Sequence, residues 1–108
     1  MSTSRTLLNV PAKATRGQIV TVRAMAQHAM ENGLRHDEQG RRIARDMIGL
    51  LRAEFDGVEV FRADLVGGIA ANPLMQFTLR IMHSGRLEVV WEGDHGYRAT
   101  ASALVEVS

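Results

Sequence analysis

The sequence predicts an all-β sandwich, and three observations lead to this fold class. Turn-forming residues recur at short, regular intervals, apolar and polar residues alternate near the C-terminus, and Asp56-Gly57 is a dipeptide that favours a two-residue hairpin turn. A chain of 108 residues with 45% hydrophobic residues has enough apolar surface for one compact core. We therefore expect residues 1–108 to form a single domain.

The N-terminal part of the chain is expected to contribute two strands. Leu7 to Val10 is a short apolar run before Pro11, which suits an edge strand because a proline there removes no donor from a central ladder. Gln18 to Ala26 is the second expected strand. Val22 to Glu31 is also rich in helix-forming residues, so the pattern alone leaves helix and strand open here.

The middle of the chain contains a predicted hairpin, in which Asp56-Gly57 joins Leu51 to Phe55 with Val58 to Ala63. The same region also fits one face of a helix, through the apolar residues Ile43, Met47, Leu50, Leu51 and Phe55. Gly49 and the hairpin signal argue against that helix, and we expect a strand. Gly67-Gly68 is interpreted as a flexible turn rather than a phosphate-binding loop.

Three further strands are expected toward the C-terminus. Asn72-Pro73 marks a loop before a strand from Leu74 to Ile81. Arg86 to Glu92 and Tyr97 to Val107 show apolar and polar alternation, which is the period of a half-buried strand. The loop Gly93 to Gly96 between them places glycine where a positive φ is available, so we expect a hairpin.

Composition argues against several classes of partner. The net charge is +1, and the basic and acidic residues are interspersed, so we expect neither nucleic acid nor a membrane surface as a partner. The chain has no cysteine, so any sulfur chemistry must use a thiol of another chain. We find no signal peptide and no apolar run near the roughly 20 residues of a membrane span, which alone would indicate a cytoplasmic protein.

The histidines and carboxylates are the residues that would support an enzymatic or metal-binding interpretation. His28, Glu31, His36 and Asp37 could be drawn together into a metal site if a turn at Asn32-Gly33 allowed two strands to bring the histidines near each other. Their spacing matches no known ligand pattern, so this is a minority interpretation. His83 and His95 lie beside glycines in turns, where we expect exposure to solvent.

The remaining charged residues are more simply explained as ion pairs. We expect Glu31 to pair with Arg35, and Asp37 and Glu38 to pair with Arg41 and Arg42, in a long exposed loop. No nucleophile elbow, zincin helix or dinucleotide fingerprint is present, so we predict no catalytic residues and no cofactor.

Met30 stands between charged and turn-forming residues. If this loop is exposed, the Met30 thioether is available to a partner chain.

Several segments together carry a resemblance to a known family. In chain order they are VPAKATRG at Val10–Gly17, HAMENGLR at His28–Arg35, GRRIAR at Gly40–Arg45, IAANP at Ile69–Pro73 and the hairpin around Trp91–Tyr97. This combination resembles SoxZ, the small sulfur-oxidation protein that pairs with SoxY. The resemblance extends from about Val10 to Val107.

The resemblance implies properties that the residue pattern does not. It implies an immunoglobulin-like sandwich that serves as the non-catalytic subunit of a SoxYZ-type carrier, in which SoxY holds sulfur intermediates on a cysteine of its C-terminal arm. Other sulfur-oxidation enzymes would be transient partners. It also implies a periplasmic protein that is exported together with a signal-bearing partner, in contrast to the cytoplasmic default.

The resemblance also indicates which residues contact the partner. These candidates are His28, Met30, Glu31, Gly33, Arg35, Arg45, Asn72 and Pro73. The family loop usually reads HPMETG followed by arginine, so Ala29 and Asn32 depart from it, and Ala44 and Leu74 replace a proline and a tyrosine of later motifs. Two alternatives remain: a generic immunoglobulin-like binding module, and a small histidine and carboxylate metal-binding protein.

Overall fold

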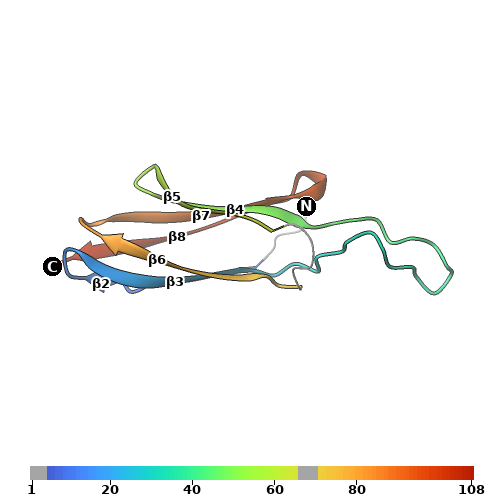
Figure 1. The fold of residues 1–108 in the computed structure, drawn as a ribbon, viewed down its shortest axis with the longest axis horizontal. Helices are drawn as coiled ribbons and strands as arrows, with labels where there is room; N and C mark the ends of the chain where they lie inside the picture. The colour runs from blue at the N-terminus through green and yellow to red at the C-terminus, as the bar shows by residue number, and fades with distance from the viewer. Residues whose placement is uncertain (1–4, 66–70) are drawn as a thin grey trace.

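The computed structural model describes residues 5–65 and 71–108, which form two β-sheets packed face to face (Figure 1). The three-stranded sheet has the order β1 (Thr6–Asn9), β3 (Gln18–Ala26), β6 (Leu74–Ile81). The five-stranded sheet has the order β2 (Lys13–Ala14), β8 (Arg98–Val107), β7 (Gly85–Gly93), β4 (Ile48–Phe55), β5 (Val58–Asp64). Only the β2–β8 pair is parallel among the described strands. The predicted all-β sandwich is confirmed.

The core lies between the two sheets because alternate side chains of the central strands point inward. Trp91, Val89 and Leu87 of β7 are fully buried, and so is Val22 of β3. Burial of each such aliphatic side chain contributes about 1.5–3 kcal/mol. The described part of the chain contains no α-helix, and none of its segments is a helix long and apolar enough to cross a membrane.

Two expected strands, Gln18–Ala26 and Leu74–Ile81, have the predicted bounds, and the helical alternative for the first is wrong. β4 begins at Ile48, three residues before the predicted start. A register shift between Ile48 and Leu50 places a bulge at Gly49. Because the extra residue leaves Ile48 and Leu51 both buried, this strand imitates the spacing of a helical face.

The turns agree with the sequence in one hairpin and differ in the other. Asp56 and Gly57 have φ of 49° and 84°, as a type I′ turn requires. The loop between β7 and β8 is a single 3₁₀ turn (Asp94–Gly96). Positive φ occurs there at His95 and Gly96, whereas Gly93 has an extended backbone. Gly93 is needed for a different reason, since a Cβ there would lie 2.4 Å from the Met47 carbonyl oxygen. The short strand β2 was not predicted, and Gly67-Gly68 lies outside the described residues.

Residues 27–47 leave one end of the sandwich as a long arm, which extends to the right in Figure 1. The chain runs outward along the first leg, residues 27–35, and returns along the second leg, residues 43–47. Isolated bridges join Glu31 to Asp46 across the two legs and His36 to Arg42 beyond them. The molecule is therefore 59 Å long, and its radius of gyration is 16.2 Å. A compact domain of 108 residues would have a radius of gyration of about 13 Å.

Candidate functional site

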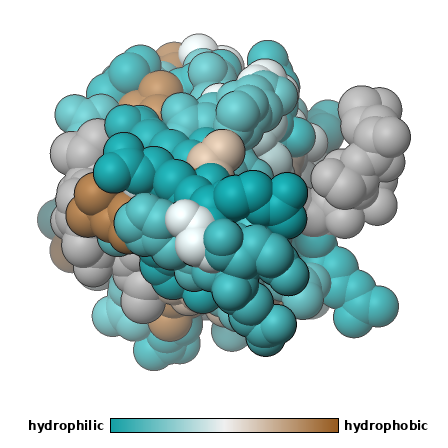
Figure 2. All heavy atoms as spheres, turned by 90° about the vertical axis from the view of Figure 1, so that its right-hand side faces the viewer, coloured by the Kyte–Doolittle hydropathy of each residue, from teal (hydrophilic) through white to brown (hydrophobic). Residues whose placement is uncertain are grey.

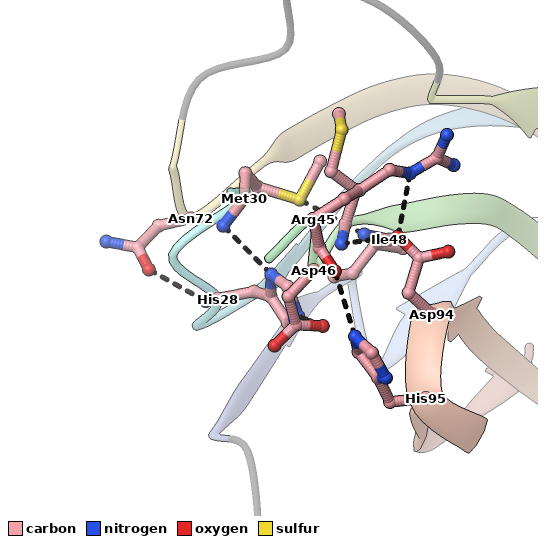
Figure 3. A network of polar contacts seen from close by, with 9 residues as sticks. His28, Met30, Arg45, Asp46, Ile48, Asn72, Asp94 and His95 are labelled. Atoms are coloured by element: carbon pink, nitrogen blue, oxygen red, sulfur yellow. Dashed lines mark hydrogen bonds and ion pairs between the residues drawn. The ribbon is translucent and has the colours of Figure 1, made fainter. Parts of the chain in front are cut away.

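The arm joins the sandwich through a network of polar contacts, which we call the arm base (Figure 3). Its members are His28, Met30, Glu31, Arg45 and Asp46 of the arm, Ile48 of β4, Asn72 before β6, and Asp94 and His95 of the β7–β8 loop. The two legs of the arm exchange backbone hydrogen bonds, from Glu31 N–H to Asp46 O (2.8 Å) and from Asp46 N–H to Glu31 O (2.7 Å). The arm base therefore begins as a short antiparallel ladder.

His28 fastens the first leg of the arm to the segment before β6. Its backbone N–H donates to Asn72 Oδ1 (2.9 Å), and the Asn72 N–H donates back to His28 O (2.7 Å). The His28 ring accepts the Met30 N–H at Nδ1 (3.0 Å), which places the ring proton on Nε2, 3.5 Å from Asp46 Oδ1. The ring also packs edge-on against Tyr97, with centroids 4.8 Å apart. The role of His28 in this geometry is therefore to hold the loop.

Met30 belongs to the core. Its side chain is buried, and its thioether sulfur accepts the Ile48 N–H at 3.3 Å. The backbone reaches this position with φ of 57°, an uncommon value outside glycine. Availability of the Met30 thioether to a partner was expected only if it were exposed, and this condition is not met, because the loop folds back at this residue and turns the side chain inward.

Asp94 fastens the second leg of the arm to the β7–β8 loop. One carboxylate oxygen accepts the Met47 N–H (3.0 Å) and the Arg45 Nε–H (2.9 Å), while the Asp94 N–H donates to Met47 O (2.9 Å). The Met47 N–H and then the Arg45 guanidinium hold the pKa of Asp94 below its ordinary value. His95 adds a contact between Nε2 and Arg45 O (2.9 Å). His95 and His83 are exposed, as predicted.

Beyond the arm base, Gly33 and Arg35 shape the middle of the arm. Gly33 has φ of 84°, and a Cβ there would lie 3.1 Å from Arg45 Cβ, so glycine allows the two legs to approach. Arg35 binds both carboxylate oxygens of Glu31, with Nε 3.1 Å from Oε2. This hydrogen-bonded pair lowers the pKa of Glu31 and raises that of Arg35. The predicted Glu31–Arg35 ion pair is confirmed.

The arm tip, residues 36–42, is organised by Asp37. The Asp37 carboxylate accepts the N–H groups of Gln39 and Arg41, both at 2.9 Å, and pairs with the Arg41 guanidinium at 3.2 Å. The reversal of the chain is therefore at Asp37–Gly40 and not at Asn32-Gly33.

Seen from the end that bears the arm, the molecule is mostly hydrophilic, with separate small apolar patches (Figure 2).

The structure separates the residues proposed for a metal site. His28 lies in the arm base, whereas His36 faces Arg42 in the arm tip, and the carboxylates of Glu31 and Asp37 are engaged by arginines. Among residues 5–65 and 71–108, no three His, Cys, Asp or Glu side chains are grouped to hold a metal ion. The arrangement that the metal-site interpretation required, with two strands bringing the histidines together, is not found, because the reversal lies beyond His36.

The predicted interface residues gather in one region of the molecule. His28, Met30, Glu31, Arg45 and Asn72 meet in the arm base, and Pro73 is buried directly before β6. The sequence did not reveal Asp46 or Asp94 as members, or Tyr97 as the ring that packs against His28. Only the position of Asp94 in a glycine-flanked turn could have suggested a bonding role for its carboxylate.

The fold defines the class of protein: an immunoglobulin-like β-sandwich that carries a long arm. Solved structures with this fold include the superoxide reductase (neelaredoxin) from Ignicoccus hospitalis, 20% identical with a TM-score of 0.76, covering 97% of this chain and 82% of that chain. A putative superoxide reductase from Thermotoga maritima is 13% identical with a TM-score of 0.75, covering 95% and 85%. At such identities, the likeness shows the fold alone.

The particular family follows from the sequence. Residues 8–104 match the family model of the sulphur oxidation protein SoxZ, and the chain belongs to the SoxZ family. The sulfur carrier protein SoxY from Chlorobium limicola f thiosulfatophilum is also similar in structure, with 15% identity and a TM-score of 0.67, covering 95% of this chain and 78% of that chain. No curated protein matches the sequence significantly. Membership of the SoxZ family implies a role in the Sox sulfur-oxidation carrier, whose SoxZ subunit is generally non-catalytic.

Proposed function

We propose that this chain is the non-catalytic subunit of a SoxYZ-type carrier. It pairs one-to-one with a SoxY-like protein, which holds sulfur intermediates covalently on a cysteine of its C-terminal arm during thiosulfate or sulfur oxidation. The observation that carries this proposal is the match of residues 8–104 to the SoxZ family model. The carrier complex works in the periplasm, and this chain is exported together with its signal-bearing partner.

The chemistry of the chain supports a division of labour between the two subunits. Without cysteine, this chain offers no thiolate that could attack a persulfide or S-thiosulfonate by exchange. The intermediate on the SoxY-like partner can therefore pass between processing enzymes without being transferred to this subunit. The polar groups of the arm base bond to one another, which suits a structural role.

The arm supports a role in presenting the carried sulfur. Its base is fixed to both sheets of the sandwich through Asn72 and Asp94. Its tip is polar and exposed, which suits transient contacts with processing enzymes better than an obligate apolar interface. Among the candidate contacts, His28, Glu31 and Arg45 lie in the arm base, and Gly33 and Arg35 lie between the base and the tip.

Native mass spectrometry of this chain co-expressed with the SoxY-like protein of the same organism tests the proposal. We expect a one-to-one complex that also survives when the partner cysteine is replaced by serine, because pairing and sulfur loading are separate functions. A monomer or homodimer that ignores the SoxY-like protein would overturn the proposal. That outcome would return the chain to the generic immunoglobulin-like binding modules.

A further inference from the structure

The sheet edges of the sandwich differ in their protection against pairing with another chain. Edge strands expose unpaired backbone groups, and proteins usually blunt them by shortness, charge, proline or bulges. β1 has four residues and is followed by Pro11, and β2 has two residues and carries Lys13. At the far edge of the larger sheet, β5 carries three charges and is bulged at Val60, the residue skipped in its pairing with β4.

β6 has none of these protections except one charge. It has eight residues, pairs with β3 in an unbroken register from Leu74 to Ile81, contains no proline, and carries only Arg80 as a charged residue. None of the described strands pairs with its other edge. Of the four edges, β6 therefore offers the longest regular row of backbone donors and acceptors.

The outer face beside this edge is apolar at the end that bears the arm. Leu7, Met25 and Leu74 follow one another across the three strands in register and point away from the core. The relative exposure is 52% for Leu7 and 55% for Leu74. An apolar row that ends at an unpaired strand can be continued by one further strand.

The position of β6 also connects it to the arm base. Asn72, which is hydrogen-bonded to His28, and Pro73 directly precede β6. On the same side of the sandwich, Phe61 of β5 stacks on Phe77 of β6, with centroids 4.3 Å apart. A strand added at β6 would thus lie beside the arm base and over the seam between the two sheets.

We propose that the free edge of β6 accepts a strand of the SoxY-like partner, so that the three-stranded sheet continues into the partner and an apolar partner side chain extends the row at Leu74. This inference rests on the proposed function. A SoxY structure shares this sandwich fold over 78% of its length, so such a partner is built of sheets with edge strands of its own. Backbone hydrogen bonds along β6 supply affinity, and the apolar row supplies register.

Hydrogen–deuterium exchange of this chain, alone and bound to the SoxY-like protein, tests the proposal without mutation. In the free chain, alternate amides of β6 exchange quickly because they point away from β3. In the complex, these amides become protected, while exchange in β5 is unchanged. Protection of β5 or β1 without protection of β6 would overturn the inference and leave the proposed function standing, whereas absence of any complex would overturn both.

A pair of variants provides the matched control. Leu74→Glu places a charge beside the β6 edge at an exposed position, and Leu104→Glu does the same on β8, where the leucine is 73% exposed. We expect Leu74→Glu to weaken binding of the SoxY-like protein by about tenfold or more, and Leu104→Glu to leave it unchanged. Equal binding by both variants would overturn the inference, as would β6 protection in a homodimer of this chain alone.

Discussion

The two ends of the arm, residues 27–47, are held in different ways, one in the arm base and one in the arm tip. In the base, His28 exchanges two hydrogen bonds with Asn72, the Asp94 carboxylate accepts the Met47 N–H, and Met30 inserts into the core. In the tip, the bonds of Asp37 are made within the tip itself. A similar difference exists within HAMENGLR, where His28 to Glu31 belong to the base, whereas the side chains of Leu34 and Arg35 are exposed.

The largest expected effect is on stability, and it distinguishes the arm base from the middle of the arm. Met30→Ala leaves a cavity and removes the acceptor of the Ile48 N–H, so we expect a loss of about 3 kcal/mol in the free energy of unfolding. Leu34→Ala, at a leucine 72% exposed, should change it by less than about 0.5 kcal/mol. Urea denaturation measures the free energy of unfolding of both variants. Equal losses of stability would contradict the distinction between a structural arm base and an exposed middle of the arm.

A second test concerns the attachment of the arm to β7. In Gly93→Ala, the added Cβ meets the Met47 carbonyl at 2.4 Å, so the second leg must shift, at about 2 kcal/mol of stability. Gly49→Ala is the matched control, because a Cβ there has no neighbour within 4 Å. Thermal unfolding should show a lower midpoint for the first variant alone. A Gly93→Ala protein as stable as wild type would show that the attachment is loose.

The sequence predicted most of the fold because strands with one buried face alternate visibly in polarity. β3 and β6 keep the predicted bounds for this reason. The alternation fails at Gly49, where a bulge shifts it by one residue, and β2 is too short to show any. Local patterns therefore predict regular strands and miss the irregular positions.

The candidate site was less predictable because its contacts are long-range. The sequence motifs indicated His28, Arg45 and Asn72, but not the fold-dependent bonds of Asp94, which is 47 residues from its partner Met47. Nothing in the local sequence showed that positive φ at Met30 turns its side chain into the core. Residue type identified the region, whereas only the fold distinguished buried from exposed members.

Acid should destabilise the arm base by protonating the Asp94 carboxylate. Its pKa is lowered in the folded chain, so its contribution to stability is present above the ordinary aspartate value of about 3.9 and is lost as the pH falls below it. In Asp94→Asn this contribution is absent. The variant should therefore lose less stability than wild type between about pH 5 and pH 3 in urea titrations. The same acid dependence in both proteins would contradict the assignment.

The smallest effect should come from the exposed charges of the arm. Arg35→Ala should weaken binding of the SoxY-like protein by roughly two- to fivefold, and more at low salt, because an exposed charge is screened by solvent and ions. Arg41→Ala, in the tip, should leave this affinity unchanged. Titration calorimetry at two salt concentrations compares the two. Unchanged affinity for Arg35→Ala would remove this part of the arm from the interface.

The most direct test of the proposed function is sulfur loading in a reconstituted thiosulfate-oxidising system, followed by the intact mass of each subunit. With both subunits present, we expect sulfur-containing mass on the cysteine-bearing partner, none on this chain, and turnover of the intermediate by the processing enzymes. Without this chain, loading or turnover of the partner should fall sharply. If the partner alone is loaded and turned over at the same rate, this chain is not a subunit of the carrier.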